Sequence, residues 1–182
     1  MLEKRIKSPV LRAIAEWLIS LGLAALLFFA LREFVFRTAH VDGSSMMPTL
    51  AHGDMIILNR VPYNFSPPRV GDIVAFPNPD NREVYYIKRI IAASGDEVDL
   101  RDGVFYINDI PLDDYFSQSP TLSLGDVVFP ITVEYERFFV LGDNRNGSQD
   151  SRFSSVGNIL ADDMIGRASL RIWQLGRVGR VE

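Results

Sequence analysis

An uncharged apolar run near the N-terminus is the feature that most limits how this chain can fold. Trp17 to Leu31 reads WLISLGLAALLFFAL, fifteen residues without a charged side chain. Apolar residues at 13–15 and 34–36 lengthen the run. Such a run is typical of a cleavable secretory leader, of a buried helix in a soluble domain, or of a membrane anchor.

The flanking residues bear on these three interpretations. A cleavable leader needs small residues just beyond the run, and Arg32-Glu33-Phe34-Val35-Phe36 does not provide them. A buried helix also fits this length. We favour a single transmembrane anchor at residues 13–36, because the Arg and Glu side chains near its ends can extend to the lipid headgroups.

Charge is divided unevenly along the chain. Residues 1–37 carry six Lys and Arg against three Glu, a net charge of +3, and residues 38–182 carry thirteen against twenty acidic residues, a net charge of −7. Because basic residues favour the cytoplasmic side, we expect residues 1–12 in the cytoplasm and the main body outside. The basic end suits an anionic bilayer, whereas the acidic body argues against a nucleic-acid partner.

After residue 37 short β-prone runs alternate with turn formers. The runs are residues 55–58, 72–76, 84–92, 104–107 and 138–141, and turn signals such as Asn78-Pro79-Asp80-Asn81 separate them. This spacing predicts a mostly β, antiparallel body. Residues 99–137, rich in Pro, Ser and acidic side chains, are expected to form an inserted β subdomain between two parts of that body, 37–98 and 138–182.

Two adjacent hydroxyls follow Gly43 and offer a nucleophile, Ser44 or Ser45. The chain has no cysteine, which excludes a thiol nucleophile, a disulfide and a zinc–cysteine site. A serine nucleophile needs a base, usually a histidine. Only His40 and His52 exist, and neither comes with an obvious orienting acid in the sequence, so a structural or exposed role is favoured for both.

Lys88 is the other candidate base. In a strand over residues 85–92, Tyr86, Lys88 and Ile90 share one face and Arg89 points to the other. Burial disfavours the ammonium and lowers the pKa of a lysine, which makes the amine a base near neutral pH. The competing interpretation is a solvated Lys-Arg pair on an edge strand.

A third polar segment, residues 141–152, reads LGDNRNGSQDSR. It is too rich in turn formers and charges to be core. It is either a surface loop with weak Asp–Arg pairs or a rigid loop that supports a site, with Ser148 or Asp150 orienting the base.

These segments resemble the conserved boxes of bacterial type I signal peptidases. The resemblance rests on residues 43–50 (GSSMMPTL), 69–76 (RVGDIVAF, with Val70 as an extra residue), 86–90 (YIKRI) and 142–152 (GDNRNGSQDSR), which occur in the family's order behind an apolar segment. It covers the chain from the anchor to about residue 166. It implies an antiparallel β-sheet catalytic domain of signal-peptidase type with an inserted β subdomain, behind one N-terminal transmembrane helix.

The resemblance also assigns roles. It implies Ser45 as nucleophile, Lys88 as general base, Ser148 as the hydroxyl that orients the lysine, and the Ser45 N–H as oxyanion donor. The residues implied to hold the active-site loops are Asp150 with Arg152 and Asp143 with Arg145. The residues implied to form shallow pockets for small side chains are Val41, Met46, Leu50, Tyr86 and Ile87.

Three positions depart from the family pattern. Gly43 stands where some members have a serine as second oxyanion donor, so that donor is absent. Ala92-Ala93-Ser94-Gly95-Asp96 replaces the common Gly-Leu-Pro-Gly-Asp, which puts the shape of that turn in question. Asn146-Gly147 replaces the frequent Asp-Asn before the box serine.

The implied activity is that of a membrane-bound serine endopeptidase that removes N-terminal signal peptides after Ala-x-Ala-like sites, without metal or other cofactor. The expected partners are signal-peptide-bearing precursors and the lipid bilayer, and a monomer is expected. The implied location is the bacterial cell membrane in single-pass topology, with a thylakoid membrane as the other option. Two alternatives stand beside this: a Ser-Lys self-cleaving repressor-type protein, and a membrane-anchored binding domain without catalysis.

Overall fold

The computed structural model describes residues 9–34, 36–64, 66–112 and 121–181, and the chain forms two compact units, Met1–Phe36 and Arg37–Glu182. The basic residues Lys4, Arg5 and Lys7 of the expected cytoplasmic tail, and Val35 of the expected anchor, lie outside the described residues.

The described part of the first unit contains one helix, α1, over Pro9–Phe34. The described part of the helix begins at Pro9, ahead of the expected start of the anchor at residue 13. Arg12 and Glu16 pair one turn apart at 3.1 Å. The apolar part, Pro9–Phe29, has 21 residues and therefore spans about 31 Å, close to the thickness of a hydrocarbon core. The helix is thus long and apolar enough to cross a membrane.

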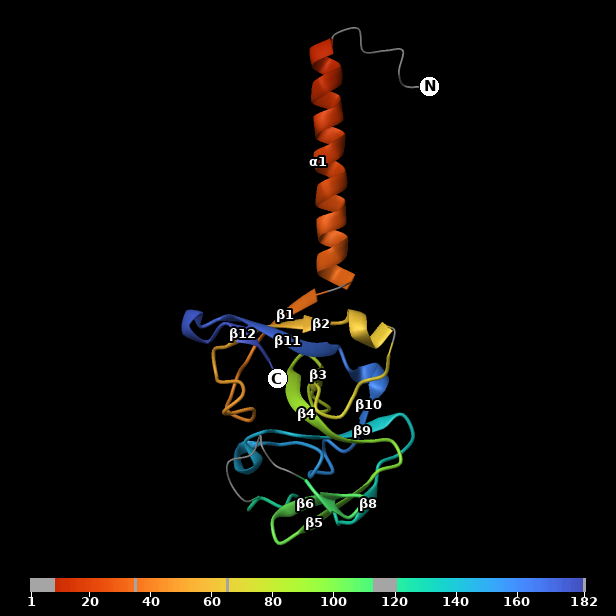
Figure 1. Cartoon of the computed structure of the whole chain (residues 1–182), viewed down its shortest axis with the longest axis vertical. Helices are drawn as coiled ribbons and strands as arrows, with labels where there is room; N and C mark the ends of the chain where they lie inside the picture. The colour runs from red at the N-terminus through yellow and green to blue at the C-terminus, as the bar shows by residue number, and fades with distance from the viewer. Residues whose placement is uncertain (1–8, 35, 65, 113–120, 182) are drawn as a thin grey trace. The chain divides into compact units, whose positions relative to one another are not determined.

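The second unit is built on a large, mostly antiparallel sheet (Figure 1). Its strands are β1 (Phe36–His40), β2 (Met55–Asn59), β3 (Ile73–Pro77), β4 (Tyr85–Ala93), β9 (Arg137–Leu141), β10 (Ile159–Leu160), β11 (Gly166–Trp173) and β12 (Gly179–Arg180). The order is β1-β2-β11-β3-β4-β9-β10, and β12 pairs with β11. The pairs of β3 with β4 and of β4 with β9 are antiparallel, which places β4 in the interior of the sheet.

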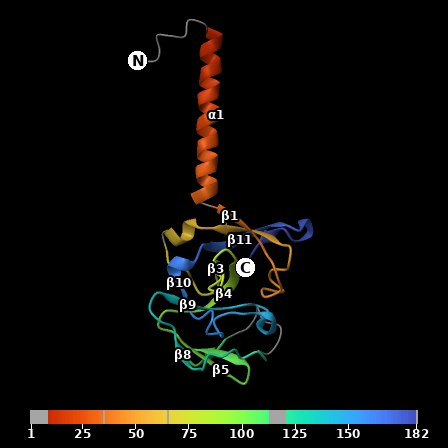
Figure 2. The ribbon, with the colours of Figure 1, turned by 180° about the vertical axis from the view of Figure 1, so that it is seen from behind.

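A second sheet contains β5 (Glu97–Arg101), β6 (Val104–Ile107), β7 (Ile110–Pro111) and β8 (Ile131–Thr132) in the order β7-β6-β5-β8. Figures 1 and 2 place it at the end of the body away from β1, β2 and β11. Its strands overlap the residues 99–137 that were expected to form an inserted subdomain, and β5 follows β4 directly through a turn at Gly95, at φ +89°. Residues 113–120 of the insertion lie outside the described residues.

Four short 3-10 helices are found among the residues of the body that the structure describes. They are η1 (Val61–Asn64), η2 (Arg145–Gly147), η3 (Ala161–Asp163) and η4 (Leu175–Arg177).

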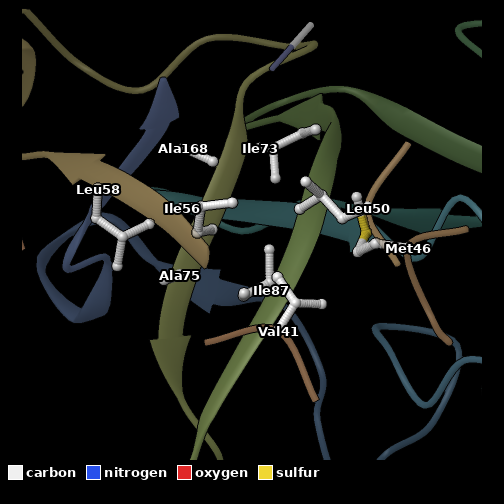
Figure 3. Close-up of a cluster of buried hydrophobic side chains, with 9 residues drawn as sticks. All are labelled: Val41, Met46, Leu50, Ile56, Leu58, Ile73, Ala75, Ile87 and Ala168. Carbon is white, nitrogen blue, oxygen red and sulfur yellow. The ribbon is translucent and has the colours of Figure 1, made fainter. Parts of the chain in front are cut away.

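Alternation along the central strands divides the core. On β3, Ile73 and Ala75 face one hydrophobic cluster, while Val74 and Phe76 face another. The first cluster gathers Val41, Met46, Leu50, Ile56, Leu58, Ile73, Ala75, Ile87 and Ala168 (Figure 3). Three of its members come from residues 41–50, so the segment that carries Ser45 is anchored in the core by apolar side chains on both sides of the serine.

The setting of β4 decides between the two interpretations of Lys88. Its side chain is 3% exposed and that of its neighbour Arg89 is 2% exposed. A solvated Lys-Arg pair on an edge strand is therefore wrong. The alternation along the strand is as predicted: Tyr86 and Ile90 pack in the second cluster and Ile87 in the first.

Candidate active site

Lys88 and Ser45 are in direct contact. The Lys88 Nζ lies 2.9 Å from the Ser45 Oγ and 3.0 Å from the Ile87 carbonyl oxygen. Ser45 is half-buried and Ser44 is exposed. The interior strand β4 fixes the lysine, and the core contacts of Met46 and Leu50 fix the serine, so a base and a nucleophile that are 43 residues apart meet at hydrogen-bond distance.

Burial sets the protonation of Lys88. The pKa of Lys88 is lowered from 10.5 to about 8, chiefly because burial desolvates the ammonium; the carboxylates of Asp150 and Asp143 raise the pKa, and the nearby Arg152 lowers it, within that net shift. The Nζ also lies 5.0 Å from the centre of the Tyr86 ring. The neutral amine that a general base requires is therefore populated to about a tenth at pH 7 and to about half at pH 8.

The loop after β9 holds the Ser45 segment by its backbone. The Asn144 N–H donates to the Ser45 carbonyl at 3.0 Å, and the Asn144 side-chain amide donates to the Ser44 carbonyl at 3.1 Å. The Thr49 hydroxyl donates to Asp143 at 2.6 Å. Three bonds thus join the nucleophile segment to this loop, on either side of the serine.

Asp143 is held in turn by Arg89. The Nε and Nη2 of Arg89 donate to the two oxygens of Asp143 at 2.9 and 2.8 Å, and both side chains are almost fully buried. Such a two-pronged pair fixes the carboxylate in position as well as in charge. The partnership expected for Asp143 was with Arg145, whereas Arg145 donates from its Nε to the Gly142 carbonyl at 3.0 Å and lies over the Phe105 ring.

Asp150 and Arg152 form a second buried pair, as the resemblance implies. The Arg152 Nε and Nη2 donate to Asp150 at 2.7 and 2.9 Å, and neither side chain is exposed. Arg152 also donates to the carbonyls of Arg145 and Ser148, at 2.7 and 3.1 Å, and to that of Ser123. Asp150 accepts from the Gly142 N–H at 3.0 Å. The pair therefore ties together the whole loop from Gly142 to Arg152.

The hydrogen bond expected from Ser148 to Lys88 is not formed. The Ser148 Oγ is buried and has no hydrogen-bond partner among the residues that the structure describes. Its hydroxyl packs instead against Gly142, where an added Cβ would overlap it. The Ser148 side chain is therefore fixed by close packing against Gly142, without a hydrogen bond to Lys88.

A cleft of about 670 Å³ opens beside the dyad. Ser45 and Lys88 line it, together with residues 38–44 and 84–87. Of the expected pocket residues, Val41, Met46, Tyr86 and Ile87 line this cleft. Leu50 does not: it is fully buried in the first cluster, so its expected role in the pocket is corrected to one in the core.

In the part of the chain that the structure describes, neither histidine forms a hydrogen bond with Ser45 or Lys88. His40 lines the cleft on β1. His52 does have an acid beside it, since its Nδ1 lies 3.1 Å from the Asp42 carboxylate, an exposed pair that the sequence did not reveal. Within the described residues, no group of three or more His, Asp or Glu side chains could hold a metal ion.

Asn144, Thr49 and Arg89 were missed as supporting residues by sequence reasoning. All three lie within or beside the matched boxes, so their position was a usable signal. The sequence carries no signal for their hydrogen-bond partners, because these are backbone carbonyls and a carboxylate from distant segments, which become neighbours only in the folded chain.

Comparison with known proteins gives consistent matches. The model of the family described as "Signal peptidase, peptidase S26" matches residues 14–173. A signal peptidase I of Leptolyngbya laminosa is 36% identical over 96% of this chain and 85% of its own length. Signal peptidase I P of Bacillus subtilis subsp. natto is 29% identical over 97% of this chain and 96% of its own length. The chloroplastic thylakoidal processing peptidase 1 of Arabidopsis thaliana is 36% identical over 80% of this chain and 46% of its own length.

Proposed function

The chain belongs to the signal peptidase family, peptidase S26, and is a serine protease that removes signal peptides; on this premise we propose that Ser45 is its nucleophile and Lys88 its general base. The observation that carries the proposal is the 2.9 Å contact between the Lys88 Nζ and the Ser45 Oγ. The depressed pKa of Lys88 supports the role of base, and the Lys88 contact with Ser45, while Ser44 is exposed, favours Ser45 as nucleophile.

In this mechanism neutral Lys88 accepts the proton of the Ser45 hydroxyl while the Oγ attacks the scissile carbonyl carbon. The ammonium then gives that proton to the departing nitrogen, so the mature protein leaves as an amine and the signal peptide stays as an ester on Ser45. Lys88 next takes a proton from water, the hydroxide attacks the ester, and the Oγ leaves with the proton restored.

The Ser45 N–H is the oxyanion donor in this proposal. No described residue accepts a hydrogen bond from it, and the bonds of Asn144 to the carbonyls of Ser44 and Ser45 hold the peptide in place. A donor that is fixed before the substrate arrives costs no reorganisation when negative charge develops on the carbonyl oxygen.

The cleft supports a preference for small side chains before the cut. Met46 is 1% exposed and Ile87 is 9% exposed, so they close the bottom of the cleft and leave little depth beside Ser45. A large side chain would overlap them. We therefore propose Ala-x-Ala-like sites as preferred substrates.

The first prediction concerns Ile87. Replacing Ile87 with valine should raise kcat/KM for a peptide with valine before the cut, relative to alanine, by about tenfold, because one methylene in an apolar pocket has about that effect. Peptide cleavage followed by mass spectrometry measures the ratio. Leu50→Val is the matched control, since it deletes the same volume from the same cluster away from the cleft, and an equal change in both variants would contradict the assignment.

The second prediction concerns pH. Because Lys88 must be neutral to act and its pKa is about 8, kcat should rise through this pH with a single apparent pKa near that value. At pH 7 only about a tenth of the enzyme would carry the free amine. Steady-state rates between pH 6 and about 10 test this. A rate that falls as pH increases from 6 to 8 would contradict the lysine base.

We propose that the enzyme is located in a membrane. The apolar helix α1 supports a single-pass anchor, and the basic residues before it support a cytoplasmic N-terminus with the catalytic unit on the other side. Bacterial cell membrane and thylakoid membrane both fit, and the monomeric state stays a prediction. The enzyme class rules out a non-catalytic binding domain, and an apolar helix in place of a DNA-binding segment disfavours a self-cleaving repressor.

A further inference from the structure

The nucleophile segment is also held by a second set of contacts, from residues that lie outside the matched boxes. Figures 1 and 2 show the orange loop that follows β1 beside the blue turn between β11 and β12. The contacts across this junction come from two arginines, Arg171 at the end of β11 and Arg177 in η4.

The arginines bind consecutive carbonyls of the segment. The Arg171 Nη1 donates to the Thr49 carbonyl at 2.9 Å, and the Arg177 Nη2 donates to the Pro48 carbonyl at 3.2 Å. These carbonyls lie three and four residues after Ser45. The Arg171 Nε donates in addition to the Arg177 carbonyl, so the two arginines are linked to each other.

A buried carboxylate keeps both cations in place. Asp54 is 0% exposed, and its Oδ2 lies 3.3 Å from the Arg171 Nη1 and 3.7 Å from the Arg177 Nη1. The same oxygen accepts from the Ala51 N–H at 2.9 Å. A buried carboxylate is stable only with such partners, so the Asp54 charge and the two arginines form one unit beneath the segment.

Thr49 is therefore held by two side-chain hydrogen bonds from different parts of the chain. Its hydroxyl donates to Asp143 and its carbonyl accepts from Arg171, while turn bonds from Met47 to Ser44 and from Leu50 to Met46 pass the constraint back to Ser45. With a base fixed in β4, the position of the serine hydroxyl depends on both hydrogen bonds.

We propose that Arg171 and Arg177, with Asp54, are positioning residues for the nucleophile: they fix Pro48 and Thr49 and thereby hold the Ser45 hydroxyl at the distance that Lys88 requires. This rests on the proposed function of Ser45 and Lys88. A displacement of about 1 Å at a reacting atom can cost as much as about 100-fold in rate, so the effect belongs in kcat. The walls of the cleft are formed by other residues, so KM should change little.

The test uses the full chain in detergent or vesicles with a precursor peptide carrying an Ala-x-Ala site. Arg171→Met alone leaves the buried Asp54 carboxylate with only the more distant Arg177 as a cationic partner, so the informative variant is Asp54→Asn/Arg171→Met, in which the amide oxygen still accepts from the Ala51 N–H. We expect kcat to fall by about 10- to 100-fold with KM within about twofold. The kcat of Arg177→Met should fall less than that of the double variant. Arg171→Lys, which keeps a positive charge at this position, should keep a higher kcat than the double variant.

Arg180→Met is the matched control, because Arg180 is exposed on β12 of the same hairpin and binds no carbonyl of the segment. A folded double variant with unchanged kcat, a rise in KM alone, or an equal loss in Arg180→Met would overturn the proposal. A Ser45→Ala sample is run in parallel. If that sample keeps its activity, the proposed nucleophile has failed, whereas an inactive Ser45→Ala with an unimpaired double variant refutes only the positioning role.

Discussion

Replacing Ser45 with alanine or Lys88 with methionine is expected to lower kcat by at least about 1,000-fold. The first variant removes the attacking oxygen, and the second removes the only base found within hydrogen-bond distance of that oxygen among the described residues. Because nucleophile and base act as a unit, the double variant should be no slower than either single variant. Cleavage of a precursor with an Ala-x-Ala site measures all three.

Two controls separate lost chemistry from lost structure. Ser44→Ala removes the neighbouring hydroxyl, which is exposed, and should keep kcat within about twofold. Lys88→Met should also be at least as resistant to unfolding as the parent at pH 7. The folded protein lowers the pKa of Lys88 to about 8 from 10.5, so the folded state disfavours its proton; this cost is full below pH 8 and disappears as pH rises toward 10.5. An active Lys88→Met, or an inactive Ser44→Ala, would refute the assigned dyad.

Gly142→Ala is expected to cause the second largest loss. A Cβ at this position would lie 2.5 Å from both the Ser148 Cβ and the Ser45 carbonyl oxygen, and it would overlap the Ser148 hydroxyl. Because the carbonyl belongs to the nucleophile's own backbone, the side chain can be accommodated only if the serine segment and the loop after β9 move apart. We expect kcat to fall by about 100-fold and the free energy of unfolding by about 1–3 kcal/mol.

Gly179→Ala is the control for this variant, since a Cβ there meets no atom within 4 Å. It should leave the rate and the unfolding midpoint unchanged, as measured by peptide cleavage and by thermal denaturation. Full activity of Gly142→Ala would show that the two loops do not approach each other as closely as the structure has them.

The supporting residues explain how the fold tolerates the unfavourable burial of charged groups around the dyad. A buried amine and buried guanidinium groups are unfavourable unless carboxylates and carbonyls compensate them. Arg89 with Asp143, and Arg152 with Asp150, form two such compensated pairs beside Lys88. Each pair also forms hydrogen bonds with the segments around the dyad: Asp143 with Thr49, and the Asp150–Arg152 pair with the loop after β9. The residues that balance the buried charges therefore also fix the positions of these segments.

Local pattern was enough to predict a mostly β body and an apolar helix long enough to span a membrane, and it placed Lys88 on one face of a strand without deciding whether that face is buried. These follow from side-chain periodicity and from uncharged length, which are properties of neighbouring residues. The matched boxes added the family and the pair Ser45 and Lys88. Tertiary structure then removed Leu50 from the pocket, left Ser148 without its expected bond to the lysine, and gave Asp143 the partner Arg89.

By itself, therefore, the sequence determined which residue types are present and which face of a strand each occupies. Only the folded chain decided that Asn144 binds the carbonyls of Ser44 and Ser45, and that Arg171 and Arg177 bind those of Thr49 and Pro48. The physical reason is that every residue carries the same backbone carbonyl, so the sequence does not indicate which carbonyls accept a side-chain hydrogen bond. The partner of a carbonyl is set by strand order and register, which bring residues far apart in the sequence into contact with the segment that carries Ser45.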